Sequence, residues 1–306
     1  MKILDLQTFG IQGVPDGSYD FALPADVSSR SGAHDLVVVT GPSGSGKTRF
    51  LELIAAVRET LAPSDDEFIA ARWIRPGNER AKAKVTWLLS DDEQRLVGAP
   101  NQVHRTETIF GGENPISSDD ELLIHLFERY DHTDSTAKIE YFAENRRLDE
   151  TGAEMRTEAS TQVRFRSSKS ARKYAFVPAF LRELPKSPEK TKRFASTIAQ
   201  LSKTCRYDVE TATLFSQGRA VRKLVELSGS ERDALLLAAT ATNVGLSHSI
   251  VLVDRPELMA SSPRDIVPGL VALGADNQLF VATARPALAS GARHVTIHLS
   301  AQGVAS

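Results

Sequence analysis

Gly41-Pro42-Ser43-Gly44-Ser45-Gly46-Lys47-Thr48 matches the phosphate-binding loop pattern G-x-x-x-x-G-K-[ST] at every fixed position. Residues 35–40, Asp-Leu-Val-Val-Val-Thr, are a short β-branched run of the kind that forms a buried strand. After the loop, apolar residues recur at helical spacing: Phe50, Leu51, Ile54, Val57 and Leu61. The sequence therefore predicts a strand, a glycine loop and a helix in succession.

That succession directs backbone N–H groups and the positive end of a helix dipole toward a phosphate. In this arrangement Lys47 reaches the β- and γ-phosphates, and the Thr48 hydroxyl is a ligand of Mg²⁺. We therefore predict binding of a nucleoside triphosphate. The expected binding residues are those of the loop: Gly41, Ser43, Gly44, Ser45, Gly46, Lys47 and Thr48.

Composition sets broad limits on this prediction. The chain has 306 residues, enough for one large domain or a core with an inserted subdomain, and its 41% hydrophobic and 25% charged content is typical of globular proteins. A net charge of −2 gives no overall attraction to nucleic acid, and the single cysteine, Cys205, excludes an internal disulfide. Because we find no apolar signal core and no bilayer-length apolar run, we expect a cytoplasmic protein.

Before the loop, residues 1–12 and 19–23 are predicted strands. We expect residues 1–62 and 207–306 to form the nucleotide-binding core, with residues 63–206 as an inserted α+β arm. Two hairpins are predicted in the arm, and the remaining elements there are a helix opening near 121, a strand and a second helix. The hairpins pair residues 83–89 with 95–98 and residues 138–142 with 146–148, and the last two elements span 174–180 and 189–205.

The last third of the chain alternates helices and strands. Residues 227–242 begin with Leu-Ser-Gly-Ser-Glu-Arg and continue as a helix rich in Leu and Ala. Apolar runs at 249–254, 278–283 and 295–299 are predicted strands. Strands and helices that alternate on both sides of a phosphate loop favour an α/β fold with a doubly wound, mostly parallel sheet, here with an antiparallel β part at the N-terminus.

A carboxylate ends the first of these strands. Ile250-Val251-Leu252-Val253-Asp254 is the Walker B pattern, in which an acid beside the phosphate loop holds Mg²⁺. The alternative is that Asp254 caps the end of a core strand. We predict that Thr48 and Asp254 hold the Mg²⁺ of a nucleoside triphosphate complex.

The order of these motifs resembles the ABC-type ATPase superfamily. Leu-Ser-Gly-Ser-Glu-Arg precedes Val-Leu-Val-Asp-Arg-Pro-Glu-Leu, and Phe-Val-Ala-Thr-Ala-Arg-Pro-Ala-Leu follows. The sequence is most similar to the non-transporter branch, which contains RecF, SMC and OLD-type proteins and many short bacterial "AAA family" ATPases. The resemblance covers residues 1–62 and roughly 207–299.

In that family, two subunits enclose two nucleotides head to head. The signature residues of one subunit contact the γ-phosphate bound by the other, and the resemblance gives this role to Ser228 and Gly229, with Glu231 completing the signature. Taken alone, the short motif Leu-Ser-Gly-Ser also fits a simple helix N-cap at Ser228 or Ser230. The resemblance thus implies a homo- or heterodimer that closes on ATP.

The sequence departs from the family at hydrolytic positions. The catalytic Glu after the Walker B Asp is Arg255, the switch His is Ala284, and the second signature Gly is Ser230. A guanidinium cannot accept a proton from water, so we predict nucleotide binding with weak or absent hydrolysis. Glu257 is the catalytic candidate that remains, with Arg255 or Arg285 as possible stabilisers of transition-state charge. For the family's Q-loop glutamine, Gln94 and Gln102 are candidates by position alone.

Several functions stay open at this stage. The closed state is expected to signal to an effector protein or to DNA, and a competent ATPase in repair or defence, using Glu257 or a base from a heterodimer partner, is the main alternative. A transporter ATPase subunit is disfavoured by the long stretch between Lys47 and Ser228, and a small-molecule kinase leaves the Ser228 and Asp254 elements unexplained. A basic stretch at 156–193 is a candidate surface for DNA or RNA, or simply a solvated charge run.

Overall fold

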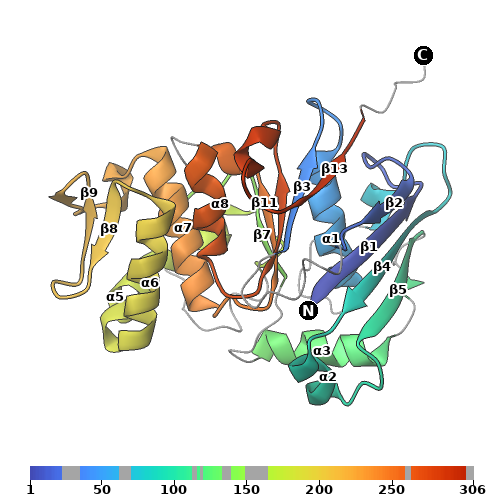
Figure 1. Ribbon diagram of the computed structural model, residues 1–306, viewed down its shortest axis with the longest axis horizontal. Coiled ribbons are helices and arrows are strands. Elements are labelled where there is room, and N and C mark those ends of the chain that lie inside the picture. The colour runs from blue at the N-terminus through green and yellow to red at the C-terminus, as the bar shows by residue number, and fades with distance from the viewer. Residues whose placement is uncertain are drawn as a thin grey trace.

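The computed structural model describes residues 1–22, 35–61, 70–111, 116–117, 120–132, 139–148, 165–258 and 263–300. These residues form two larger sheets and a small third one, with helices packed between and around them (Figure 1). No described helix has the length and apolar character needed to cross a membrane.

The first sheet is antiparallel, with strand order β2-β1-β4-β5-β6. Its strands are β1 (Lys2–Phe9), β2 (Gly17–Asp20), β4 (Ala81–Leu88), β5 (Val103–Phe110) and β6 (Ile116–Ser117). The expected antiparallel part at the N-terminus is therefore present. It is larger than predicted, because β4 and β5, which come from the middle of the chain, join it through β1.

The second sheet is parallel throughout, with strand order β13-β3-β12-β11-β7. Its strands are β3 (Asp35–Thr40), β7 (Ile139–Phe142), β11 (Ile250–Asp254), β12 (Gln278–Ala282) and β13 (Val295–His298). Because all five run in one direction, their carboxyl ends meet at a single edge of the sheet. That edge carries the candidate site.

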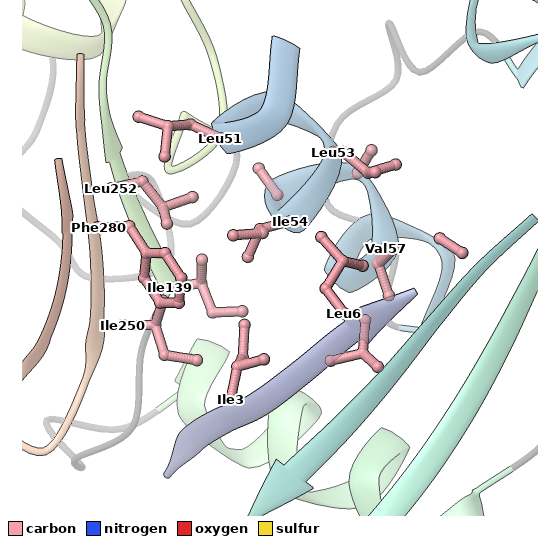
Figure 2. Packing of buried hydrophobic residues seen from close by; sticks show 14 of the residues in the cluster. Ile3, Leu6, Leu51, Leu53, Ile54, Val57, Ile139, Ile250, Leu252 and Phe280 are labelled. Atoms are coloured by element: carbon pink, nitrogen blue, oxygen red, sulfur yellow. The ribbon is translucent and has the colours of Figure 1, made fainter. Parts of the chain in front are cut away.

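Helix α1 (Lys47–Leu61) packs between the two sheets. Its Leu51, Ile54 and Val57 belong to one buried cluster with Ile3 and Leu6 of β1 and with residues of the parallel strands (Figure 2). The strand residues are Ile139, Ile250, Leu252 and Phe280. Full burial of each such side chain contributes about 1.5–3 kcal/mol, so this cluster fixes α1, and the loop before it, against the parallel sheet.

The opposite face of the parallel sheet has its own core. Alternate residues of the same strands, such as Leu36, Val38 and Val251, belong to this second cluster. It is covered by α5 (Val177–Glu183), α6 (Pro188–Leu201), α7 (Gly229–Asn243) and α8 (Pro263–Val271). A small sheet of β8 (Cys205–Asp208), β9 (Thr213–Ser216) and β10 (Arg219–Ala220) lies beyond these helices.

The remaining helical elements are short. Helix α2 (Asp91–Val97) connects β4 to β5, and α3 (Glu121–His132) packs beside α2 and α1. Single 3₁₀ turns occur at η1 (Ala70–Trp73), η2 (Ala171–Tyr174), η3 (Leu184–Lys186), η4 (Leu224–Glu226), η5 (Pro256–Leu258) and η6 (Pro286–Ala289).

Three predicted strands were wrong. Residues 95–98 belong to α2, because Ser90 and Glu93 form a capping box there and Gly98 ends the helix at φ 66°. Residues 174–180 fall in η2 and α5, where a proline occupies the first turn of the helix. Residues 146–148 do not return as a hairpin strand, since β7 instead pairs in parallel with β11.

The segment 63–206, expected to be a separate arm, is shared between the two parts of the fold. Strands β4 and β5 extend the antiparallel sheet, and β7 is an edge strand of the parallel sheet. Helix α6 packs against α7 and α8. The segment is divided in this way because its strands pair with strands that are distant in sequence, and local sequence patterns do not reveal such pairing. Within the described residues, this segment therefore does not form a unit of its own.

Candidate functional site

The phosphate loop connects β3 to α1, as the sequence predicted. Gly41 and Gly46 have positive φ angles of 151° and 91°. A Cβ on Gly46 would lie 1.9 Å from the carbonyl oxygen of Gly13, and one on Gly41 would lie 2.2 Å from that of Leu299. Both positions therefore require glycine, because the loop is packed against the backbone of the segments that follow β1 and β13.

Helix α1 begins at Lys47, and its first hydrogen bond is from the Phe50 N–H to the Gly46 carbonyl at 2.8 Å. The N–H groups before this point lack intrahelical acceptors, as at any helix start, and carry the positive end of the dipole. The Lys47 Nζ donates to the carbonyls of Gly41 at 2.9 Å and Pro42 at 2.7 Å. The ammonium is thus held at the loop, where an anion would meet it.

Asp254 ends β11 and is 1% exposed. The pKa of its carboxyl is raised, mainly by burial and also by the nearby charges of Glu144 and Glu52. A hydrogen bond from the Thr48 hydroxyl and the charge of Arg146 act in the opposite direction and lower this pKa. Its Oδ2 atom is buried without a hydrogen-bond partner among the described residues. A buried carboxylate oxygen beside a hydroxyl is a donor set that suits a hard cation.

These groups line one pocket of about 880 Å³. The described lining residues come from the phosphate loop and α1, from the segment after β1, and from the carboxyl ends of β7, β11 and β12: Gln12, Gly13, Ser43, Gly44, Gly46, Lys47, Thr48, Arg49, Glu52, Arg72, Glu144, Asp254, Arg255 and Ala284. No group of three or more His, Cys, Asp or Glu side chains that could hold a metal occurs in the described chain.

Two of the three positions that depart from the family pattern, Arg255 and Ala284, line the same pocket, whereas Ser230 lies at the start of α7. Arg255 has a positive φ of 48° and forms an ion pair with Glu144. Ala284 also lines the pocket, whereas Glu257 does not. One Glu257 carboxylate oxygen accepts the Thr283 hydroxyl at 2.8 Å. The structure thus does not bring the predicted catalytic candidate to the phosphate loop.

Sequence reasoning missed several pocket residues, and Glu144 is the one that faces a predicted site residue, Arg255; the others are Gln12, Gly13, Arg49, Glu52 and Arg72. Glu144 lies two residues after β7, as an acid that follows Ile139-Glu140-Tyr141-Phe142-Ala143. The signal resembles that at Asp254, but β7 has only four residues and was assigned to a hairpin. The Q-loop candidates Gln94 and Gln102 are not in the pocket. Gln94 donates to the Ala99 carbonyl, and Gln102 contacts Asp91.

The signature residues lie outside this pocket, at the N-terminus of α7. Ser228 is the N-cap: its Oγ accepts the Glu231 N–H at 3.4 Å and donates to the Glu231 carboxylate at 2.8 Å. Burial raises the pKa of the Glu231 carboxyl, but hydrogen bonds from the Ser228 N–H and from the Ser216 and Ser228 hydroxyls outweigh burial and lower it overall. Ser228 and Gly229 are exposed, and no atom lies within 4 Å of a Cβ built on Gly229.

A buried arginine connects α7 to the end of β11. The Arg146 guanidinium donates to the Ala143 carbonyl at 2.7 Å, to the Asp254 carbonyl at 2.9 Å and to Asp233 of α7 at 3.3 Å. Burial raises the pKa of the Asp233 carboxyl, while Arg146 lowers it. Helix α7 and the end of β11 are therefore attached to one side chain.

Much of the basic stretch is structural in the described residues. Lys173 is buried and paired with Glu140 at 2.5 Å, and Lys169 is paired with Glu52. Arg193 donates to the Leu246 carbonyl at 2.7 Å. Arg172, Arg182, Lys186, Lys190 and Lys192 remain exposed, while Arg156 and Arg164 lie outside the described residues. The predicted nucleic-acid surface thus loses several of its charges to internal contacts.

Comparisons with known proteins give structural matches only. No family model matches the sequence, and no curated protein does. The chain is similar to an SMC head bound to the C-winged helix domain of ScpA, with 14% identity over 95% of this chain and 91% of that one, at a TM-score of 0.56. It is also similar to the recombination mediator protein RecF, with 8% identity over 97% and 96% of the two chains and a TM-score of 0.48. The likeness to the SMC head, at 14% identity, shows that this chain has the fold of that head.

Proposed function

We propose that this protein binds ATP with Mg²⁺ in the pocket at the phosphate loop. The observation that carries the proposal is the pairing of an intact loop with a buried carboxylate. Lys47 and the start of α1 supply positive charge, and Asp254 offers, next to Thr48, a buried oxygen with no partner in the described part of the chain. Thr48 and Asp254 would hold Mg²⁺, which neutralises charge on the terminal phosphates when it is bound.

The second part of the proposal is closure of two heads on nucleotide. Ser228 and Gly229 are exposed, lie at a helix N-terminus and are outside the pocket of their own chain. A phosphate bound by a second copy, or by a related subunit, would find N–H groups and a positive dipole there. The similar SMC head is bound to a protein partner, so we propose that an effector protein or DNA recognises the closed state.

The third part is weak hydrolysis. Arg255 stands where a general base is needed, and Ala284 has no side-chain group to hydrogen-bond the γ-phosphate. Glu257, the retained acid, is engaged with Thr283. These features support a protein that binds nucleotide and hydrolyses it weakly or not at all.

A competent ATPase is the second candidate, and the observation in its favour is Glu144. This carboxylate lines the pocket and is close enough to Asp254 to raise its pKa. Single-turnover phosphate release with excess protein separates the two candidates. Slow release that Glu144→Gln leaves unchanged supports weak hydrolysis, and fast release that Glu144→Gln abolishes supports the ATPase.

Closure is tested by sedimentation velocity with Mg²⁺ and the β,γ-imido analogue of ATP. We expect wild type to shift from monomer to dimer. Ser228→Arg should bind the analogue yet remain monomeric, because its side chain fills the space intended for the partner's phosphate. Ser228→Ala controls for loss of the cap, which destabilises a helix by about 0.5–2 kcal/mol. Thr211→Arg places the same bulk on an exposed turn. Dimerisation of Ser228→Arg as strong as that of wild type would contradict the proposal.

A further inference from the structure

The ion pair between Arg255 and Glu144 occupies the pocket at the carboxyl ends of two adjacent strands. Arg255 follows β11 directly, and Glu144 follows β7. Their side chains are 47% and 45% exposed. Because β3, β7 and β11 are parallel members of one sheet, the pair lies at the same edge as the phosphate loop and lines the same pocket as Gly44 and Lys47.

The backbone that carries Arg255 is fixed, whereas its guanidinium is not buried. The Arg255 N–H donates to the Ala282 carbonyl at 2.9 Å, and Arg146 holds the Asp254 carbonyl at 2.9 Å. The positive φ of 48° is uncommon for a residue with a side chain, and it turns the chain sharply at this point. Movement is therefore expected in the side chain rather than in the backbone.

An ion pair at this exposure contributes little to stability, because water screens both charges. A guanidinium binds phosphate through two parallel charge-assisted hydrogen bonds, a geometry that matches it well. The terminal phosphate of a nucleoside triphosphate, with more negative charge than one carboxylate, can therefore displace Glu144 from Arg255. A diphosphate lacks that group and leaves the pair intact.

We infer that Arg255 recognises the γ-phosphate and that Glu144 holds its guanidinium when the γ-phosphate is absent. The pair then sets the preference for ATP over ADP: Arg255 strengthens ATP binding, and Glu144 opposes it by competing for the same cation. The residue at the position of the missing general base thus has a binding role. This inference rests on the proposed nucleotide site.

The test is a set of equilibrium titrations with Mg²⁺, using ADP and the β,γ-imido analogue of ATP as separate ligands. Arg255→Ala should weaken binding of the analogue by about tenfold, equivalent to about 1.4 kcal/mol, and change ADP binding by less than about twofold. Glu144→Gln should strengthen binding of the analogue by roughly two- to fivefold without affecting ADP. Arg255→Lys keeps the positive charge but loses the paired N–H donors of the guanidinium, so its affinity for the analogue should lie between those of wild type and Arg255→Ala.

Controls separate this effect from general changes in charge or folding. Arg147→Ala and Glu210→Gln remove exposed charges outside the pocket and should leave both affinities unchanged. Circular dichroism checks that each variant is folded. If Arg255→Ala weakens ADP and the analogue equally, or if Glu144→Gln weakens the analogue, the inference fails while the proposed site stands. If folded wild type binds neither nucleotide, both fail.

Discussion

Replacing Arg146 with methionine is expected to lower the free energy of unfolding by about 3–5 kcal/mol, the range for breaking a buried ion pair from one side. The Arg146 side chain is 0% exposed and Asp233 is 12% exposed, so the change leaves the Asp233 carboxylate without its countercharge. It also removes the donor to the carbonyls of Ala143 and Asp254. Each unsatisfied carbonyl alone costs about 1–3 kcal/mol, although such terms are not additive.

Urea unfolding at 25 °C, followed by the fluorescence of the buried Trp73 and Trp87, measures the loss. Arg147→Met is the matched control, since its side chain is exposed and surface changes usually stay within about 0.5 kcal/mol. The double variant Arg146→Met with Asp233→Leu removes both charges and should recover part of the stability, because residues in contact couple by about 0.5–3 kcal/mol. A loss below about 1 kcal/mol in Arg146→Met, at unchanged urea dependence, would refute the assigned role of this arginine.

Three further predictions follow from single residues. Asp254→Asn should raise the Tm of the nucleotide-free protein, because burial raises the pKa of this carboxyl and its negative charge therefore opposes folding. The gain in Tm over wild type should grow as the pH increases from about 4, near the pKa of an unfolded aspartate. A gain in Tm that does not change with pH in thermal scans would show that the buried charge is not its cause. Gly46→Ala should abolish nucleotide binding in fluorescence titrations, because its Cβ collides with the Gly13 carbonyl, and retention of wild-type affinity would show that the loop tolerates the displacement. Burial raises the pKa of the Cys205 thiol to about 12, so a disulfide exchange reagent should label it only as fast as the protein unfolds, and rapid labelling of folded protein would contradict its buried position.

The sequence predicted those parts of the fold in which local chemistry and long-range pairing agree. Strands β3, β11 and β12 consist largely of consecutive apolar residues, which predicts burial. The glycine pattern of the loop after β3 is specific to phosphate-binding loops. Helix α7 was visible through its cap at Ser228, which the structure retains.

The errors occurred where pairing over long sequence distances decides the outcome. Nothing local to residues 139–142 indicates that they pair in parallel with β11 rather than in a hairpin, and this hid the position of Glu144. Similarly, β4 pairs with both β1 and β5, so a segment from the middle of the chain completes the N-terminal sheet. At residues 95–98, the capping box at Ser90 outweighed a pattern that suggested a strand.

The pocket was predicted well around the loop before α1 and incompletely at the carboxyl ends of β7 and β11. Lys47, Thr48 and Asp254 meet in one pocket because the carboxyl ends of parallel strands share an edge. Glu257 is close in sequence to Asp254, but the turn at Arg255 directs it to Thr283 instead. Sequence proximity alone could not reveal that turn.

The most direct test of the central claim is an isothermal titration of ATP with Mg²⁺ into purified wild type and into Lys47→Ala. We expect saturable binding with one ATP per chain in wild type, and a loss of at least about tenfold in affinity in the folded variant, because Lys47 supplies a charge-assisted contact to the phosphates. Equal affinities in the two proteins, or no binding to folded wild type, would contradict the assignment of this pocket to ATP.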